Sequence, residues 1–349
     1  MTSRVARPAA LAVVVVVLAI LPLLDVPTAG VLPGPLSSPG TLQLLALCLV
    51  FGALALSYDV MFGHTGLLSF GHALFFAAGV YGTALAMEHW ALGLVPAALV
   101  ALAGSIVLAL LVGAVSLRVG GIAFAMVTLA FAQAGSILVA LDPAEVTGGE
   151  LGLSLPYEHV PAAFLGVLNT ANLYWLALAL LVVTYLLVTV ATRSVPGRVW
   201  EAIRENEQRV RVLGLRPYTF KLVSFVFASA LGALTGVVYL LVVGGANPGV
   251  TSAQFTLTLL VMVVLGGSGS RWGPVLGGIL YTYLDLRLSG LSTSETVQGL
   301  PPVLRVPMSE PLFVLGLLFV LIILFVPGGV AGLVGRIRQR RAPRTEMAT

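Results

Sequence analysis

Long apolar runs recur along this chain and constrain its fold more than any other feature of the sequence. A transmembrane helix needs about 20 predominantly apolar residues to cross a hydrocarbon layer about 30 Å thick. The composition agrees, since 58% of the 349 residues are hydrophobic and 9% are charged, whereas a soluble domain carries about 25% charged residues. The sequence therefore predicts an all-α integral membrane protein with about ten transmembrane helices. The ten runs lie at 9–24, 41–58, 71–88, 92–117, 121–141, 173–192, 218–243, 255–269, 273–289 and 309–327.

The basic residues fall almost entirely on one side of these spans. With the N-terminus placed in the cytoplasm, the inside segments hold 16 of the 18 lysines and arginines, and only Arg287 and Arg305 fall outside. The outer segment 142–172 carries four acidic residues and no lysine or arginine. The positive-inside rule describes this distribution, so both termini are predicted to be cytoplasmic. The inside residues are Arg4, Arg7, Arg118, Arg193, Arg198, Arg204, Arg209, Arg211, Arg216, Lys221, Arg271, Arg336, Arg338, Arg340, Arg341 and Arg344.

What the spans lack argues against several kinds of protein. No span carries a string of arginines for voltage sensing, and the acidic residues lie mostly at span ends, which disfavours a proton-driven carrier. The single cysteine, Cys48, is interpreted as a small apolar residue. The only lysine, Lys221, follows Phe220, so the Gly-Lys pair of a P-loop is absent. We find no nucleophile with an evident base and no metal motif, so we expect no catalytic residue and no metal site. The basic residues lie in short loops beside apolar spans, which is the pattern of cytoplasmic membrane flanks, so we expect no nucleic-acid partner.

A glycine-rich segment at 57–72 interrupts the apolar pattern. Three glycines in nine residues favour a bend or a broken helix at or near the membrane. Irregular backbone at that depth must be buried in protein or line an aqueous cavity, and transporters place solute paths at discontinuous helices. An ordinary cytoplasmic turn with close helix packing, in which the histidines are structural, is the alternative. The candidate solute-pathway residues are Gly63, His64, Thr65, Gly66, Ser69, Gly71 and His72.

Two further segments are too polar or too rich in glycine for a plain lipid-facing helix. In 118–133, Thr128 and Gln133 are polar residues inside a span. They are candidate pathway residues, with close helix packing as the alternative. The segment 265–274 combines glycines with an arginine and a tryptophan, which is typical of a turn at the inner interface. The spacings Gly232-x3-Gly236 and Gly273-x3-Gly277 predict close helix crossings.

A charged amphipathic segment at 194–215 lies between two apolar runs on the inner side. Pro196 suits the start of a helix, with Ser194 or a neighbour as its cap, and Gly214 suits its end. A helix of about four turns that is charged yet keeps apolar side chains needs a partner protein or lipid headgroups to cover them. The favourable i,i+4 pairs are Glu205–Arg209 and Glu207–Arg211.

Five stretches, in this order along the chain, resemble the signatures of one family of permeases. The run 63–73 is similar to the family's glycine-rich stretch, and 121–132 is similar to its Val-Thr-Leu-Ala-Phe-Ala stretch. Residues 147–153 resemble its Thr-Gly-Gly motif, 197–214 its coupling loop, and 266–274 its later glycine-rich signature. Over roughly 40–330 the chain thus resembles the LivM-type permeases of branched-chain amino acid ABC importers. It departs from their pattern at His64, where tyrosine is usual, and at Glu150-Leu151, where an aspartate-containing pair is common.

This resemblance implies a transport subunit of the bacterial plasma (inner) membrane that translocates branched-chain or other hydrophobic amino acids by alternating access. It implies two ABC ATPase subunits, a sister permease and an extracytoplasmic solute-binding protein as partners. ATP with Mg²⁺ is expected on the ATPases, and this chain is expected to bind no cofactor and to catalyse no reaction. The helix within 197–214 would couple to an ATPase cleft through Glu201, Ala202, Ile203, Arg204, Glu205, Arg209 and Gly214.

The chain is expected to divide into three parts. These are an N-terminal helix and outer loop (1–40), a permease domain (41–330) that includes the coupling loop 193–217, and a basic cytoplasmic tail (331–349). The first run is interpreted as a retained helix, because 25–30 lacks the pattern of a signal-peptide cleavage site. Two alternatives stay open: an ABC permease for urea or short amides, and a stand-alone ion-coupled secondary carrier that needs no partner-docking helix.

Overall fold

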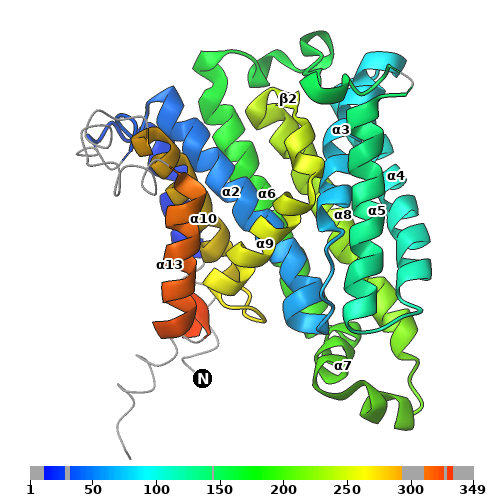
Figure 1. The fold of residues 1–349 in the computed structure, drawn as a ribbon. Coiled ribbons are helices and arrows are strands. Elements are labelled where there is room, and N and C mark those ends of the chain that lie inside the picture. The colour runs from blue at the N-terminus through cyan, green and yellow to red at the C-terminus, as the bar shows by residue number, and fades with distance from the viewer. Residues whose placement is uncertain (1–11, 28–31, 144, 293–309, 326–327, 333–349) are drawn as a thin grey trace, which may run out of the picture.

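The computed structural model describes residues 12–27, 32–143, 145–292, 310–325 and 328–332, which fold almost entirely into helices packed in one bundle (Figure 1). The main helices are α2 (Pro39–Asp59), α3 (His72–Trp90), α4 (Leu94–Ser116), α5 (Ile122–Leu141), α6 (Thr170–Arg193), α7 (Val195–Val212), α8 (Pro217–Val243), α9 (Ala253–Gly266), α10 (Gly273–Ser292) and α13 (Pro311–Phe325). The π-helix η2 spans Val60–Thr65, and the short 3-10 helices are η1 (Leu21–Leu23), η3 (Gly149–Leu151), η4 (Tyr157–His159), η5 (Ala162–Phe164), η6 (Val167–Asn169) and η7 (Pro248–Thr251). Two short strands, β1 (Leu153–Ser154) and β2 (Gly245–Ala246), pair antiparallel.

Each of the ten predicted apolar runs coincides with a helix among the described residues, the first of them with the apolar helix Ala12–Leu23. Five helical stretches are long and apolar enough to cross a membrane by length and composition alone: Pro39–Thr65, Leu94–Ser116, Ile122–Leu141, Val167–Arg193 and Pro217–Val243. The all-α membrane architecture is therefore confirmed. The number of spans and the side on which the termini lie stay predictions. Residues 1–11, Arg305 and nearly all of the predicted tail, 333–349, lie outside the described residues.

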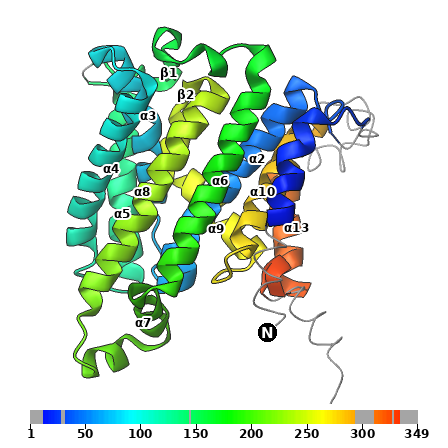
Figure 2. The ribbon, with the colours of Figure 1, turned by 180° about the vertical axis from the view of Figure 1, so that it is seen from behind.

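Helix α2 lies inside the bundle, whereas α4 and α5 lie at its edge. In the most apolar part of each helix, 83% of the residues of α2 and η2 are buried, against 28% in α4 and 22% in α5. Helices α6, α8 and α10 pack against α2, and α3 packs between α4 and α8; Figure 2 shows α6 crossing in front of α2. The apolar surface that α4 and α5 expose is suited to lipid or to another membrane helix.

Glycines set the closest helix crossings, as two of the sequence spacings predict. A methyl group on Gly236 of α8 would overlap a backbone carbonyl of α3, and one on Gly79 of α3 would overlap a carbonyl of α8. In the same way, a methyl group on Gly277 of α10 would overlap a carbonyl of α9. Small residues allow membrane helices to gain van der Waals contact where water supplies no hydrophobic driving force. The predicted close crossings are therefore confirmed.

The loop between α5 and α6 covers the end of the bundle opposite α7. The Asp142 carboxylate accepts hydrogen bonds from the backbone N–H groups of Val146 (2.7 Å), Thr147 (2.8 Å) and Gly148 (2.9 Å). These bonds stabilise the charged form of Asp142 and hold its pKa below its usual range. The bond from the Thr147 N–H has the largest effect. The pairing of β1 with β2 ties this loop to the chain that follows α8.

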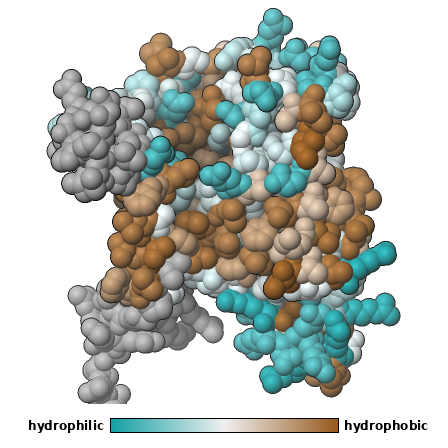
Figure 3. Space-filling view, in the orientation of Figure 1, coloured by the Kyte–Doolittle hydropathy of each residue, from teal (hydrophilic) through white to brown (hydrophobic). Residues whose placement is uncertain are grey.

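The surface of the molecule is banded. Figure 3 shows a hydrophobic belt across the middle of one face, with hydrophilic residues above it and a hydrophilic lower end. Helix α7 forms that lower end (Figures 1 and 3). An apolar belt between polar ends is the surface that a bilayer requires, because the hydrocarbon layer offers no water to polar groups.

Candidate functional site

The helix that begins at Pro39 breaks where the sequence predicts a bend. Helix α2 continues into η2 and stops at Gly66, whose φ of 75° is in the left-handed region that favours glycine. Residues 67–71 then run without helical structure until α3 begins at His72. The Thr65 hydroxyl donates a hydrogen bond to the Val60 carbonyl (2.9 Å), which secures the π-helical turn. The predicted break in this helix is confirmed.

The non-helical segment after the break lies inside the bundle, beside α5 (Figure 1). The Phe70 N–H donates to the Thr128 hydroxyl (3.1 Å), and the Ala73 N–H donates to the Thr256 hydroxyl (3.2 Å). Thr128 is the seventh residue of α5, so the segment reaches about 9 Å beyond the start of that helix. Hydroxyls of α5 and α9 thus take the place of water as partners for backbone groups at membrane depth.

His72 is fully buried in the first turn of α3. Its Nε2 lies 2.9 Å from the Ser57 hydroxyl, which donates its own proton to the Leu54 carbonyl (2.7 Å). Because Ser57 uses its proton in that bond, Nε2 of His72 carries the proton that it donates to Ser57. The ring of Tyr58 meets the His72 ring edge-on, with centroids 5.4 Å apart. This geometry fits the structural alternative that the sequence left open for this histidine.

The structure gathers the predicted pathway residues into two neighbouring places and leaves one apart. Gln133 is exposed on α5, whereas Thr128 of the same helix is buried. Gln133 is therefore not part of the buried group, and any part that these residues play in solute passage stays a prediction. One group lies around the start of α3 and consists of Ser69, Gly71 and His72, together with Thr128 from α5. The other group lies in η2 and at its end and consists of Gly63, His64, Thr65 and Gly66.

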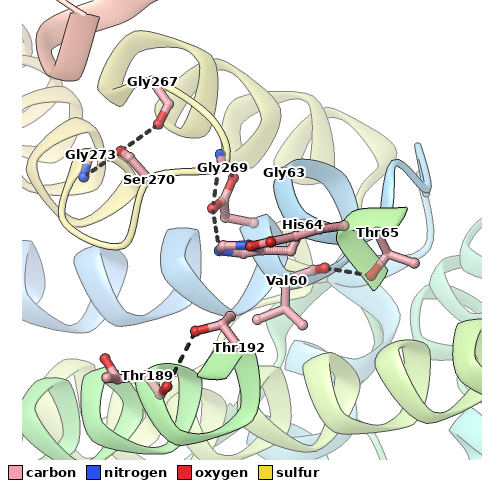
Figure 4. Close-up of polar contacts among 12 residues, drawn as sticks. Val60, Gly63, His64, Thr65, Thr189, Thr192, Gly267, Gly269, Ser270 and Gly273 are labelled. Carbon is pink, nitrogen blue, oxygen red and sulfur yellow. Dashed lines mark hydrogen bonds and ion pairs between the residues drawn. The ribbon is translucent and has the colours of Figure 1, made fainter. Parts of the chain in front are cut away.

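A second group of polar contacts, at the α7 end of η2, includes two residues that the sequence analysis did not select. Asp59 is fully buried at the end of α2, and its two carboxylate oxygens accept the Gly269 N–H at 3.0 and 3.2 Å. The Nε2 atom of His64 lies 3.7 Å from the same carboxylate. Figure 4 shows Gly269 above His64, with Gly63 beside it. The sequence feature that could have indicated Asp59 is a lone carboxylate at the end of an apolar helix, directly before a glycine-rich segment.

Helix α7 lies against this group. The Arg204 guanidinium donates a hydrogen bond to the Gly63 carbonyl, and Oε1 of Glu201 lies 3.7 Å from Nδ1 of His64. Residues three apart share one face of a helix, so both contacts come from the same side of α7. Two predicted coupling residues therefore contact two predicted pathway residues, a link that the sequence did not predict.

Apolar and charged contacts anchor the rest of α7 to α8. Trp200 is 2% exposed and stacks on Phe227 of α8, and its indole N–H donates to the Phe220 carbonyl (2.9 Å). Glu207 accepts hydrogen bonds from Lys221 of α8 (2.5 Å) and from Arg211 (2.6 Å). Burial disfavours the charged form of Glu207, but these two cations outweigh it and hold its pKa below the usual range.

The predicted single helix over 196–214 is kinked at Asn206. Its φ of −161° and ψ of 100° are not helical, and its side-chain oxygen accepts the Arg209 N–H (2.9 Å), which caps a second helical segment. Among the ion pairs of the described residues, Glu207–Arg211 is present at 2.6 Å and Glu205–Arg209 is not. The prediction of one uninterrupted helix and of a Glu205–Arg209 pair is therefore wrong, because the kink breaks the i,i+4 spacing.

Replacing Trp200 with alanine is expected to loosen α7 from α8. Removing a large buried aromatic side chain costs about 3–5 kcal/mol, and the hydrogen bond to the Phe220 carbonyl is lost as well. We expect faster protease cleavage within 195–216 of the purified protein and a lower Tm. The control is Val212→Ala, at a side chain that is 83% exposed, and equal cleavage rates in the two variants would contradict the anchoring role.

Comparison with known proteins agrees with this architecture. Residues 40–326 match the family described as branched-chain amino acid transport system, permease component. The high-affinity branched-chain amino acid transport system permease proteins LivM of Escherichia coli and Salmonella typhimurium are each 30% identical over 304 aligned residues, which cover 77% of this chain and 71% of the relative. A probable branched-chain amino acid transport permease protein LivM of Methanocaldococcus jannaschii is 28% identical over 205 residues, covering 58% of each chain.

No solved structure matches the chain significantly. The family match nonetheless extends from the start of α2 to just beyond α13, and so includes the broken helix, α7 and the loop that carries Gly269. The chain therefore belongs to the family of branched-chain amino acid transport system permease components, and it is a permease of the LivM type.

Proposed function

We propose that this chain is the membrane-spanning permease subunit of an ATP-driven ABC importer in the bacterial inner membrane. It would carry branched-chain or other hydrophobic amino acids by alternating access; the relatives, which are branched-chain amino acid transport permeases, support this class of solute. The observation that carries the proposal is α7, which contacts Gly63 and His64 of the broken helix through Glu201 and Arg204. ATP with Mg²⁺ would bind to separate ATPase subunits, so this chain would be a transport subunit without a cofactor.

The end of α7 beyond the kink has the features of a docking surface. Val212 and Leu213 are 83% and 73% exposed, although the helix around them is charged. Exposed apolar side chains with a polar rim mark sites of protein contact. An ATPase subunit that covers these two side chains and pairs with Glu205 and Arg209 would fit this end, which Gly214 closes at a φ of 82°.

The charge distribution supports the orientation that this role needs. Ten spans, with α7 and both termini in the cytoplasm, place 16 of the 18 basic residues on the side of the ATPases. The acidic loop between α5 and α6 then faces the outside, where a solute-binding protein would dock. Its fold is fixed locally by Asp142 and by the pairing of β1 with β2.

The exposed face of α5 fits a sister permease. Gln133 lies near the middle of this helix and is exposed among apolar side chains such as Met126 and Ile137. An amide that faces hydrocarbon without a partner costs free energy. A second permease packed against α5, with the solute path between the two, would give Gln133 a polar environment, and two ATPases would serve the pair.

The test is an exchange of two exposed charges on α7, Glu205→Arg with Arg209→Glu. The exchange keeps the net charge, so it leaves the topology signal intact. In the complex reconstituted in liposomes with its ATPases and binding protein, we expect ATP-driven leucine uptake to fall about tenfold, within the usual range of coupling between sites. We expect ATP hydrolysis to continue, because the catalytic residues lie on other subunits.

The control is Arg118→Gln, an exposed arginine in the loop between α4 and α5, which should leave uptake unchanged. Normal uptake by the charge-exchanged variant would contradict the coupling role. Solute accumulation by this chain alone, driven by an ion gradient, would instead favour a secondary carrier. Tighter binding of urea than of leucine by the binding protein would move the solute to the urea class.

A further inference from the structure

We propose that Asp59 is a positioning residue that holds three segments together as one rigid unit, called here the inner junction. The inner junction consists of the first half of α7 (195–205), η2, and the loop 267–272 between α9 and α10. The inference rests on the proposed function, because it supposes that an ATPase displaces α7. Displacement of α7 would then reach the broken helix and the α9–α10 pair together.

Asp59 is the point at which the membrane segments of the inner junction meet. Its side chain is fully buried, and both of its oxygens accept the N–H of Gly269, which is 210 residues away in the sequence. His64 lies 3.7 Å from the same carboxylate. A buried carboxylate is stable only when it is hydrogen-bonded or paired. Separation of the loop from η2 would leave this charge without its partner.

Helix α7 completes the same group of contacts. Arg204 donates a hydrogen bond to the carbonyl of Gly63, the residue against which the Asp59 carboxylate packs, so its positive charge lies close to that carboxylate. Glu201 lies on the far side of His64, 3.7 Å from Nδ1. Acidic and basic groups therefore alternate from α7 into the buried end of α2. A shift of α7 alone would move the exposed Glu201 and Arg204 away from the buried His64 and Asp59.

Two glycines leave no room for the segments to slide past one another. A methyl group on Gly63 would overlap the Asp59 carboxylate and approach the Gly269 nitrogen. A methyl group on Gly269, at a φ of 77°, would lie 2.6 Å from Nη1 of Arg204. Packed interiors transmit displacement because they hold few voids. The backbones of η2 and of the loop are thus in direct contact, with Arg204 against both.

Helix α9 carries a displacement of the loop to the start of α3. It begins near Thr256, which accepts the Ala73 N–H, and ends at Gly266, next to the loop that bears Gly269. These two positions are ten residues apart, or about 15 Å along a helix. The non-helical segment before His72 is therefore held at one end by η2 and at the other by α9. Of these two elements, η2 belongs to the inner junction, and α9 leads directly into its loop 267–272.

The first test replaces the charge of Asp59 but keeps its shape, with Asp59→Asn. An asparagine oxygen can still accept the Gly269 N–H, but the attraction to Arg204 is lost. In the reconstituted complex we expect assembly and ATP hydrolysis to persist while uptake falls about tenfold. The matched control, Asp285→Asn, changes a half-buried carboxylate of α10 outside the junction and should leave uptake unchanged. Normal uptake by Asp59→Asn would overturn the proposal.

The second test reports motion and does not depend on how well the Asp59 variant folds. Spin labels are attached at Arg198→Cys and Ser268→Cys, both exposed positions, in a Cys48→Ala background, and distances are measured with and without ATP. We expect the distance between the labels at positions 198 and 268 to stay constant, because both positions belong to the inner junction. The reference pair, Arg198→Cys with Arg118→Cys, should change its distance as α7 moves relative to α4.

The outcomes separate the two proposals. A change in the Arg198–Ser268 distance would show that the inner junction does not move as one unit, whatever the transport activity. If neither distance changes and the unmodified complex shows no ATP-driven uptake, the proposed function itself fails. We expect three results together. The distance within the junction stays constant, the reference distance changes, and of the two asparagine variants only Asp59→Asn has an uptake defect.

Discussion

Leucine in place of Gly236 is expected to leave little folded protein in the membrane. At this position α8 crosses α3 with the two backbones in contact, and even a methyl group would overlap the Phe76 carbonyl. Overpacking a core typically costs about 1–3 kcal/mol and more where side chains cannot move aside. Because a backbone atom is the obstacle here, the two helices would have to separate. We expect the yield of monodisperse protein in size-exclusion chromatography to fall about tenfold, which corresponds to about 1.4 kcal/mol.

The matched control is the same change at Gly104 of α4, where no neighbouring atom lies within 4 Å of an added Cβ. Gly104→Leu should give a yield close to that of the unmodified protein, since an exposed apolar side chain on α4 is compatible with lipid. Similar yields from the two leucine variants would mean that the α3–α8 crossing tolerates separation. The close approach at Gly236 would then not be a requirement of the fold.

Alanine in place of Gly63 is expected to abolish uptake with a smaller effect on folding. The added methyl group would overlap the Asp59 carboxylate and displace Gly269. The change is confined to one end of the bundle, so the crossings at Gly79 and Gly236 stay intact. Loss of the coupling between α7 and the broken helix is expected to reduce ATP-driven uptake about a hundredfold, near the upper end of typical coupling energies.

The measurement for Gly63→Ala is the ratio of leucine uptake to ATP hydrolysis in the reconstituted complex. Gly120→Ala is the control, because an added Cβ there meets no atom within 4 Å and Gly120 lies in the loop between α4 and α5, outside the inner junction. A ratio for Gly63→Ala equal to that of the control would contradict a need for backbone contact between η2 and the loop at Gly269.

The features that the sequence predicted are those that depend on neighbours along the chain. Apolar runs of membrane length, the glycine-rich break before His72 and the glycine spacing of α8 are local patterns, and each matched a feature of the fold. Pro196 likewise marked the first turn of α7. Periodicity and turn chemistry act over a few residues, so a single sequence is sufficient to locate such elements.

The features that were missed depend on tertiary packing or on competition between two local choices. The bond from Gly269 to Asp59 joins residues 210 positions apart, and no pattern along one chain pairs them. At Asn206 a continuous helix competes with the capacity of asparagine to cap a new helix. In the structure Asn206 caps the second segment and the helix is kinked. The hydroxyls of Ser69 and Thr128 were selected as pathway candidates, and the structure shows that they also satisfy the backbone of the break.

The burial of α2 also has a consequence for how the chain matures during synthesis. Its partners α6, α8 and α10 emerge from the ribosome long after it. Roughly 200 residues separate the end of α2 from the start of α10, so at about 5–20 residues per second the delay is on the order of ten to forty seconds. Throughout that interval Asp59 has no Gly269 to bind. The N-terminal third of the protein must therefore wait in the bilayer beside lipid or an insertion factor, and its native packing is completed only when the last third arrives.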